Sequence, residues 1–257
     1  CPYERGGSIA LSQSEGGPGL AVPIYSVWPN LGRAPKTISE GIAGHLLYAG
    51  SGHTHQLDGL DLEGAVALVD FNCSMRWLNV AQFGTAAIVF IEPEQTFRKE
   101  AEDKFLQIPA SIQRYYILRS DLARLLGRVL GTDVTPDSLE QALRALNRRP
   151  RTAVTVKMDV LWENRTCRNI VGTIVGTDPK LRHETVIIES YYDSISAVPA
   201  LAPGAESACG IAALLEIARA LKANPPARTV RFLATAGHFQ ALAGIRQWCR
   251  DYYVWER

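Results

Sequence analysis

The sequence predicts an α/β protein in two parts: a β-rich first half, and a second half built on an open, mostly parallel sheet with helices packed on it. Two observations carry this prediction. Short apolar runs separated by turn residues dominate the first half, whereas apolar strands alternate with amphipathic helices in the second. A polar, basic break at 147–151 separates the two patterns. We therefore expect an irregular, Gly/Ser-rich entry segment at 1–18, a β-rich domain at 19–147 and a sheet domain at 151–257.

The β-rich half is predicted to contain a compact βαβ unit. Apolar runs at 65–70 and 86–91 are typical of short buried strands. The segment 74–83 between them fits a helix, because Ser74 is a good N-cap and Gly84 suits the position after the last turn. Two further helices are expected, one after Ser120 that stops near Gly131 and one from Thr135-Pro136 to about Asn147.

The second half is predicted to form a sheet with the chain order β, β, β, α, β, α. The expected strands are 153–160, 169–175, 185–189 and 229–235, and the expected helices are 210–222 and about 241–252. In open sheets of this kind, the chemistry lies at the carboxyl ends of the strands. Two loops follow such ends, at 190–194 and 236–240, and we expect a functional site there.

Composition and charge exclude several kinds of partner. The chain has 257 residues, of which 47% are hydrophobic and 21% charged, as in ordinary globular proteins. Its net charge of +1 gives no electrostatic reason to expect nucleic acid or an anionic membrane as a partner. No apolar run approaches the roughly 20 residues of a membrane span. No signal segment opens the chain, so we expect any targeting sequence to lie outside it.

The cysteines favour free thiols. None of the five forms a C-x-x-C pair, so a zinc ribbon has no support. Their odd count and wide spacing predict mostly free, buried thiols, with one or two disulfides as the alternative in an oxidising compartment. Cys1 is either an arbitrary chain end or the lipidated first residue of a bacterial lipoprotein.

The second half resembles a known family in its motifs. It carries Y-Y-D-S at 191–194, A-P-G-A-E-S-A-C-G at 202–210, A-L-L-E-I-A-R-A-L at 213–221 and T-V-R-F-L-A-T-A-G-H-F-Q-A-L-A-G at 229–244. These resemble the zinc aminopeptidase family that includes bacterial leucyl aminopeptidases, glutamate carboxypeptidase and the non-catalytic transferrin receptor. The resemblance implies that 151–257 is the N-terminal part of such a domain, apparently truncated.

The first half resembles the protease-associated domain that is often inserted in these peptidases. The matching segments are Gly64 to Asp70, the pair Cys73-Ser74, Gly84 to Phe90, and Ile108-Pro109-Ala110. The resemblance implies a lid or interaction module at 19–147 that has no chemistry of its own.

The resemblance also implies a set of metal ligands, from which this chain departs. Family members hold two zinc ions with two histidines and three carboxylates, and a glutamate acts as general base. The first histidine aligns with Tyr191, the bridging aspartate with Glu206, the base with His238, and the adjacent ligand with Phe239. Asp193 is kept, but in the family it orients the missing histidine. We therefore expect no metal and no cofactor, with zinc as the alternative.

Each of the three kept or altered polar residues also has a structural interpretation. Asp193 can cap the loop after its strand, and Glu206 can be a helix-entry carboxylate favoured by the helix dipole. His238 can be a hydrogen-bonded cleft residue.

Two other features of the sequence give only weak support for a metal site or a catalytic nucleophile. His53 and His55 would face the same side of a strand and resemble a small metal clip, but two ligands lack a third. Cys209 could be a nucleophile at a helix N-terminus, although packing explains it better.

The sequence thus favours a non-catalytic, peptidase-like protein used for binding or assembly, outside the cytoplasm and with a protein or peptide partner. The alternative is a zinc-dependent aminopeptidase that removes N-terminal residues of peptides and whose remaining ligands lie outside this chain. Under either hypothesis the chain can be part of a larger polypeptide or complex.

Overall fold

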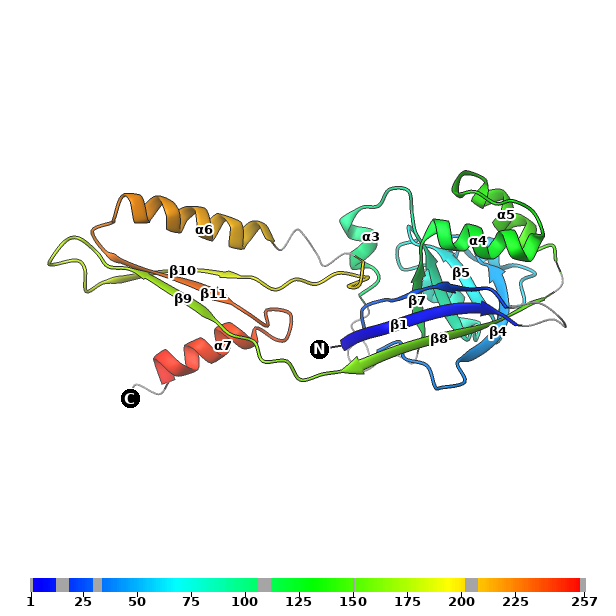
Figure 1. Ribbon diagram of the computed structural model, residues 1–257, viewed down its shortest axis with the longest axis horizontal. Helices are drawn as coiled ribbons and strands as arrows, with labels where there is room; N and C mark the ends of the chain where they lie inside the picture. Colours follow the sequence, from blue (N-terminus) through cyan, green and yellow to red (C-terminus); the bar gives the residue numbers. More distant parts are fainter. Residues whose placement is uncertain are drawn as a thin grey trace. The chain divides into compact units, whose positions relative to one another are not determined.

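The computed structural model describes residues 2–12, 19–29, 34–105, 112–149, 151–201 and 208–254. It is an α/β protein of two compact units (Figure 1). Unit 1 comprises Cys1–Glu163 together with Ala197–Leu201, and unit 2 comprises Asn164–Ser196 and Ala202–Arg257. Within the described segments, no helix is long and apolar enough to cross a membrane.

Unit 1 is built on one eight-stranded sheet. Its strands are β1 (Pro2–Leu11), β2 (Ala21–Pro23), β3 (Tyr25–Ser26), β4 (Ile42–Tyr48), β5 (Val66–Asp70), β6 (Ala87–Ile91), β7 (Arg114–Ile117) and β8 (Thr152–Trp162). They lie in the order β2-β1-β8-β4-β5-β6-β7-β3. The end strands β2 and β3 are separated by Ile24 alone, and they pair with β1 and β7 respectively. This one segment therefore joins the two edges and closes the sheet, so that neither edge is left open.

Short helices connect the parallel strands β4 to β7. They are α1 (Thr54–Leu57), α2 (Trp77–Gln82) and α3 (Arg98–Glu102). Because β5 and β6 are parallel and joined through α2, the predicted βαβ unit is confirmed. The helix is shorter than the predicted 74–83, because Ser74 has a left-handed backbone (φ 49°) and does not cap it.

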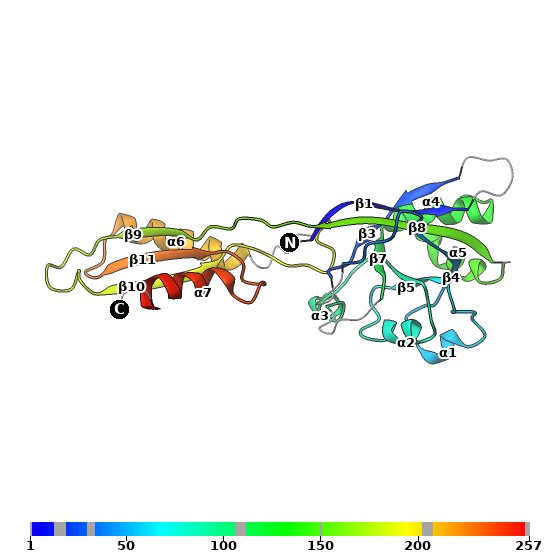
Figure 2. The same ribbon diagram turned by 90° about the horizontal axis from the view of Figure 1, so that it is seen from below.

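The two helices predicted before the basic break are confirmed. α4 (Arg119–Leu130) ends at Gly131, whose φ of 70° is left-handed. The Thr135 side chain accepts a hydrogen bond from the Ser138 backbone N–H and caps the 3₁₀ turn η1 (Pro136–Ser138), which leads into α5 (Leu139–Leu146). Figure 2 shows α4 and α5 on one side of β5, and α1 and α2 on the other.

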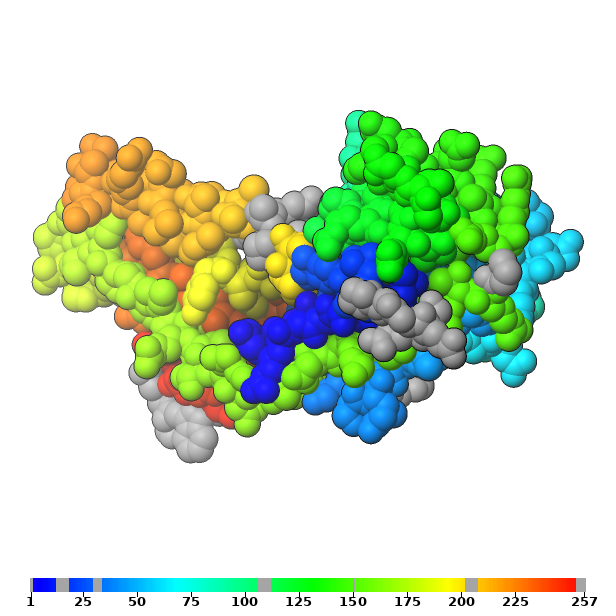
Figure 3. Space-filling model, turned by 45° about the vertical axis from the view of Figure 1, so that its right-hand side comes forward, coloured from blue at the N-terminus to red at the C-terminus, as the bar shows by residue number. Residues whose placement is uncertain are grey.

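Two predictions about the sheet of unit 1 are wrong. Residues 2–11 form β1, not an irregular segment, because they pair with β8 from Pro2↔Trp162 to Leu11↔Val154. Figure 3 shows β1, in dark blue, at the surface, which agrees with its mostly exposed or half-buried side chains. The sequence also places the strand at 153–160 in the second half, but this strand is β8, which pairs with β1 and β4 in unit 1.

The domain boundary therefore lies after Glu163 and not at 147–151. The basic stretch is a connection inside unit 1, between α5 and β8. Asn147 fixes it to β4, because its side chain accepts the Tyr48 backbone N–H at 2.8 Å and donates to the Tyr48 carbonyl at 2.7 Å.

Both faces of the unit 1 sheet are covered by apolar side chains. Val66 and Leu68 of β5 belong to one buried cluster, with side chains from strands all round the sheet and from α4 and α5. Ala67 and Val69 point to a second cluster that includes Trp77 of α2. Burial on both faces explains why 65–69 is a continuous apolar run and does not alternate.

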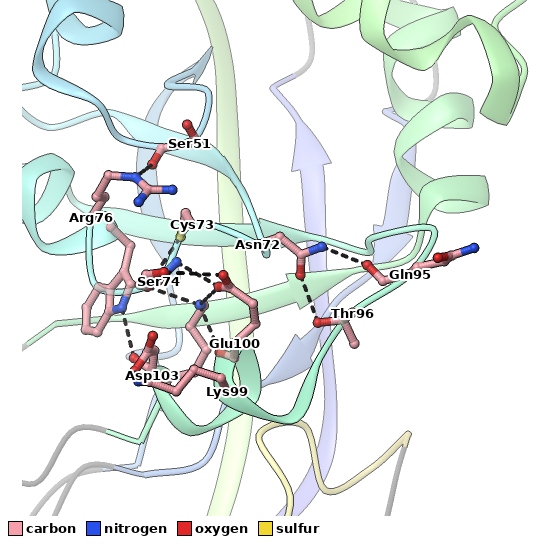
Figure 4. A network of polar contacts seen from close by, with 12 residues as sticks. Ser51, Asn72, Cys73, Ser74, Arg76, Gln95, Thr96, Lys99, Glu100 and Asp103 are labelled. Atoms are coloured by element: carbon pink, nitrogen blue, oxygen red, sulfur yellow. Dashed lines mark hydrogen bonds and ion pairs between the residues drawn. The ribbon is translucent and has the colours of Figure 1, made fainter.

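A charged network is buried in unit 1 (Figure 4). The Lys104 side chain is 0% exposed, and its Nζ donates to the carbonyl oxygens of Ser74 (3.2 Å) and Glu100 (3.0 Å). Nζ also lies 3.4 Å from Glu100 Oε2, which accepts the Ser74 backbone N–H at 2.7 Å. Burial lowers the pKa of the Lys104 amine, while nearby Cys73 and Glu100 act in the opposite direction.

The Cys73-Ser74 pair is thus a structural feature of this network. Cys73 is fully buried, and burial raises the pKa of its thiol, which disfavours a reactive thiolate. The preceding Asn72 accepts the Thr96 hydroxyl at 2.8 Å and donates to the Gln95 carbonyl at 2.7 Å. These contacts hold the segment that leads into α3 against the end of β5.

Unit 2 contains a small mixed sheet with helices. Its described strands are β9 (Ile170–Ile174), β10 (Thr185–Tyr191) and β11 (Thr229–Thr235), in the order β10-β11-β9. β10 and β11 are parallel, but β11 and β9 are antiparallel, so the expected mostly parallel sheet is mixed in the described part of unit 2. The helix α6 (Ala208–Ala223) contributes Leu214 to a small core with Val230 and Phe232. α7 (Ala243–Cys249) continues into a π-helical turn, Arg250–Val254.

Candidate functional site

Four of the five predicted site positions meet in unit 2. Tyr191 is the last residue of β10, and Asp193 follows it. His238 and Phe239 lie in the turn after β11. Because β10 and β11 are parallel with Tyr191 opposite Thr235, their carboxyl ends bring these residues together, as the strand order predicted. Glu206 lies outside the described residues.

Three aromatic rings make one cluster at this site. The Tyr191 and His238 rings stack with centroids 3.9 Å apart and planes 24° apart. The Phe239 ring stands edge-on to both, at 5.7 Å from Tyr191 and 5.0 Å from His238. All three residues are half-buried. Each ring therefore covers part of its neighbours, in geometries that aromatic groups favour.

Asp193 holds the turn that carries His238. Both carboxylate oxygens accept the His238 backbone N–H, at 3.2 and 3.0 Å. The turn begins with Gly237 (φ 70°) and includes Ala241 and Leu242, which have φ values of 54° and 58°. Non-glycine residues rarely adopt this left-handed conformation, so the turn depends on its anchoring contacts. The geometry agrees with a structural role for Asp193.

Asn169, which the sequence did not single out, also fixes this turn. Its Nδ2 donates to the Gly244 carbonyl at 2.8 Å, and its Oδ1 accepts the Ala236 backbone N–H at 3.3 Å. A Cβ at Gly244 would lie 2.2 Å from the Ala236 carbonyl oxygen, so only glycine fits there. The sequence gives no sign of this role, because both hydrogen-bond partners of Asn169 lie more than 60 residues away in the chain.

The described donor groups do not fit a pair of zinc ions. Phe239 has no donor atom, Tyr191 offers a phenol, which is not a common zinc ligand, and both oxygens of Asp193 accept a backbone N–H. The His238 ring is stacked on Tyr191 and stands where the resemblance places a carboxylate base. Across the part of the chain that the structure describes, no three His, Cys, Asp or Glu side chains are grouped as metal ligands would be.

The structure places the two weaker candidates, the histidine pair and Cys209, differently from what the sequence predicts. His53 is not on a strand: it precedes α1, and its ring stacks on that of His55 at 5.3 Å. The prediction of mostly buried cysteines is wrong among those described. Cys73 is buried, but Cys167, Cys209 and Cys249 are free and exposed. Packing therefore does not explain Cys209, which lies in the first turn of α6.

A second polar pair lies in unit 1, at the ends of β4 and β5. The Tyr48 hydroxyl donates to Asp70 Oδ1 at 2.8 Å. Burial raises the pKa of the Asp70 carboxyl, the Tyr48 hydrogen bond acts to lower it, and the charge of Glu140 raises it further. Burial and the charge of Asp70 also raise the pKa of Tyr48. The charged form of Asp70 is therefore poorly compensated in the folded protein.

Replacing Asp70 with asparagine should stabilise the protein at pH 7.5 and do so less at pH 4. An acid whose folded-state pKa is raised loses stability as the pH rises from its ordinary pKa through the raised value, because the unfolded state ionises first. Asparagine keeps an oxygen for Tyr48 and carries no charge. Urea denaturation at the two pH values measures the difference. Asp58→Asn, at an exposed position, is the control. If Asp70→Asn raised the stability equally at both pH values, the raised pKa of Asp70 would be contradicted.

Comparison with known families bears on unit 2. Residues 169–252 match Peptidase family M28. This match covers the site loops and supports the resemblance to zinc aminopeptidases. Among solved structures, the Aminopeptidase from Aneurinibacillus sp. strain AM-1 is similar with 19% identity and a TM-score of 0.44, over 97% of this chain and 55% of that chain. The chain thus spans little more than half the length of that aminopeptidase. No curated protein matches the sequence.

Proposed function

We propose that the chain is a non-catalytic relative of the M28 peptidases that binds a protein or peptide partner outside the cytoplasm. The observation that carries the proposal is the stack of Tyr191 on His238, closed by Phe239. By resemblance, these three residues stand at the positions of a histidine ligand, the general base and a carboxylate ligand. Here they contact each other.

The chemistry of these side chains supports the proposal further. A phenol is not among the side chains that commonly bind zinc. Both oxygens of Asp193 bind the backbone N–H of His238, so this carboxylate secures the turn and has no histidine ligand to orient. An aromatic surface at the ends of two strands suits recognition better than hydrolysis, because aromatic side chains contribute strongly to binding.

The alternative is a zinc-dependent aminopeptidase with unusual ligands. The match of 169–252 to Peptidase family M28 favours it. In that case Glu206 and residues outside this chain would have to complete the zinc site.

A zinc assay separates the two proposals when it is made on the full-length natural protein, which includes any ligands that lie outside this chain. After equilibration with zinc and gel filtration, we expect that protein to retain less than one tightly held zinc ion at this site, because a catalytic zinc needs about three good protein ligands. We also expect no hydrolysis of leucine p-nitroanilide, and no change in zinc content for His238→Ala. About two zinc ions per chain, with zinc-dependent hydrolysis lost in Glu206→Ala, would establish the enzyme instead.

A further inference from the structure

A cleft of about 580 Å³ lies in unit 1 where three parallel strands end. Its lining includes Tyr48 and Asp70, the last residues of β4 and β5, and Glu92, which follows β6. The starts of α4 and α5 form the facing wall. The carboxyl ends of parallel strands are the usual place for a ligand in α/β sheets, and the volume is in the range of ordinary ligand sites, roughly 300–1,000 Å³.

Among the described residues that line the cleft, one is a cation and several are carboxylates. Arg119 is the basic residue in its lining, and it is committed to Glu94 at 3.1 Å and to the Pro136 carbonyl at 2.7 Å. Asp70 and Glu92 have no ion-pair partner among the described residues. Glu92 Oε2 accepts the Arg119 backbone N–H at 2.9 Å, which fixes its side chain at the strand end. A cationic group in the cleft would therefore meet two held carboxylates that lack a counter-charge.

Apolar side chains form one part of the wall. Phe71, Ile91, Leu139 and Leu143 line the cleft beside the carboxylates. A bare metal ion would make no use of these groups and would not fill the volume. A lysine or arginine side chain would contact both the apolar side chains and the carboxylates of the cleft, because its methylene groups pack on apolar surface while its charged end pairs with carboxylates.

We propose that this cleft binds a lysine or arginine side chain of a partner peptide, with Asp70 and Glu92 as its acceptors. Carboxylates on an open surface would be no more than a solvated face, whereas here a cavity of ligand size and an apolar wall accompany them. The raised pKa of Asp70 fits this, because a bound cation would offset the cost of its buried charge. The proposal concerns unit 1 alone and holds whichever function unit 2 has.

Binding of fluorescein-labelled tetra-arginine to the whole chain, followed by anisotropy at low salt, tests the proposal. We expect saturable binding that weakens about tenfold or more in the double variant Asp70→Asn, Glu92→Gln, because both charges are lost. Both substitutions keep the hydrogen-bond acceptors that Tyr48 and Arg119 use. The matched control is Asp58→Asn, Glu63→Gln, which changes the net charge equally at exposed positions of the same unit.

A second peptide tests the apolar wall. A labelled tetrapeptide of 2-amino-3-guanidinopropionate has the same four guanidinium groups but only one methylene group in each side chain, and we expect it to bind several-fold more weakly. Absence of saturable tetra-arginine binding, equal weakening in the control variant, or equal affinity for the two peptides would overturn the proposal. Unchanged circular dichroism of both double variants shows that the comparison is between folded proteins.

Discussion

Replacing Glu100 with alanine is expected to lower the free energy of unfolding of unit 1 by about 3–5 kcal/mol. The Glu100 side chain is 17% exposed and lies beside Lys104, which is fully buried. Without the carboxylate, the Lys104 amine keeps its backbone carbonyl partners and the faces of two aromatic rings but loses its ion pair, and the Ser74 N–H loses its acceptor. A buried cation without its counter-charge costs far more than an exposed one. Urea denaturation followed by circular dichroism measures the loss.

The same helix provides a matched control. Glu102 lies two residues on in α3 and pairs with Arg98, but both side chains are largely exposed, at 49% and 72%. Glu102→Ala should therefore cost less than about 1 kcal/mol. Similar losses for the two alanine variants would contradict a special role for the buried pair.

A double replacement distinguishes burial of charge from loss of packing. Lys104→Met leaves Glu100 without its cation and should also destabilise. In the double variant Glu100→Ala, Lys104→Met no unpaired charge remains, so we expect its loss to be smaller than the sum of the single losses. Additive losses would mean that the two groups contribute independently.

Replacing Val198 with aspartate is expected to cost on the order of 3 kcal/mol or more, because it puts a carboxylate into an apolar cluster. Val198 is 6% exposed and packs in the cluster of Trp77 and Phe90 in unit 1. The Ala197 carbonyl accepts the Trp28 backbone N–H at 2.8 Å and ties the same segment down. Urea denaturation measures the loss, and limited proteolysis should show faster cleavage at 195–201.

Leu201 is the control for this substitution. It belongs to the same five-residue segment but is 38% exposed. Leu201→Asp should therefore change the stability by less than about 1 kcal/mol. If the two aspartate variants lose the same free energy of unfolding, the apolar cluster does not hold this segment.

The predicted secondary structure was close to the structure where one local signal decided each boundary. Gly131 ends α4, and Thr135-Pro136 opens the turn before α5. The strand 229–235 has the predicted bounds, and α6 covers the predicted helix 210–222. Capping residues, glycine and helical periodicity act within a few residues, so they can be recognised in the sequence alone.

The positions of the candidate site were also predictable, but their contacts were not. Parallel strands place the residues after β10 and β11 together, which is why Tyr191 and His238 meet. That their rings stack, and that Asp193 binds the His238 N–H, depends on the path of two turns. The anchoring of one turn by Asn169 gave no signal at all in the sequence.

By itself, the sequence determined several strands and helices, such as β5, β11, α4 and α6. It also determined which chemistry the site positions lack: a phenol at Tyr191 and a phenyl ring at Phe239 cannot act as two good zinc ligands in any fold. Only the tertiary structure decided that β8 belongs to unit 1, that residues 21–26 close its sheet, and that Ala197–Leu201 returns to its core. The alternation of a strand tells which side chains are buried, but not which strand lies beside it. Strand-pairing partners and clefts arise between residues far apart in the chain, where local patterns carry no information.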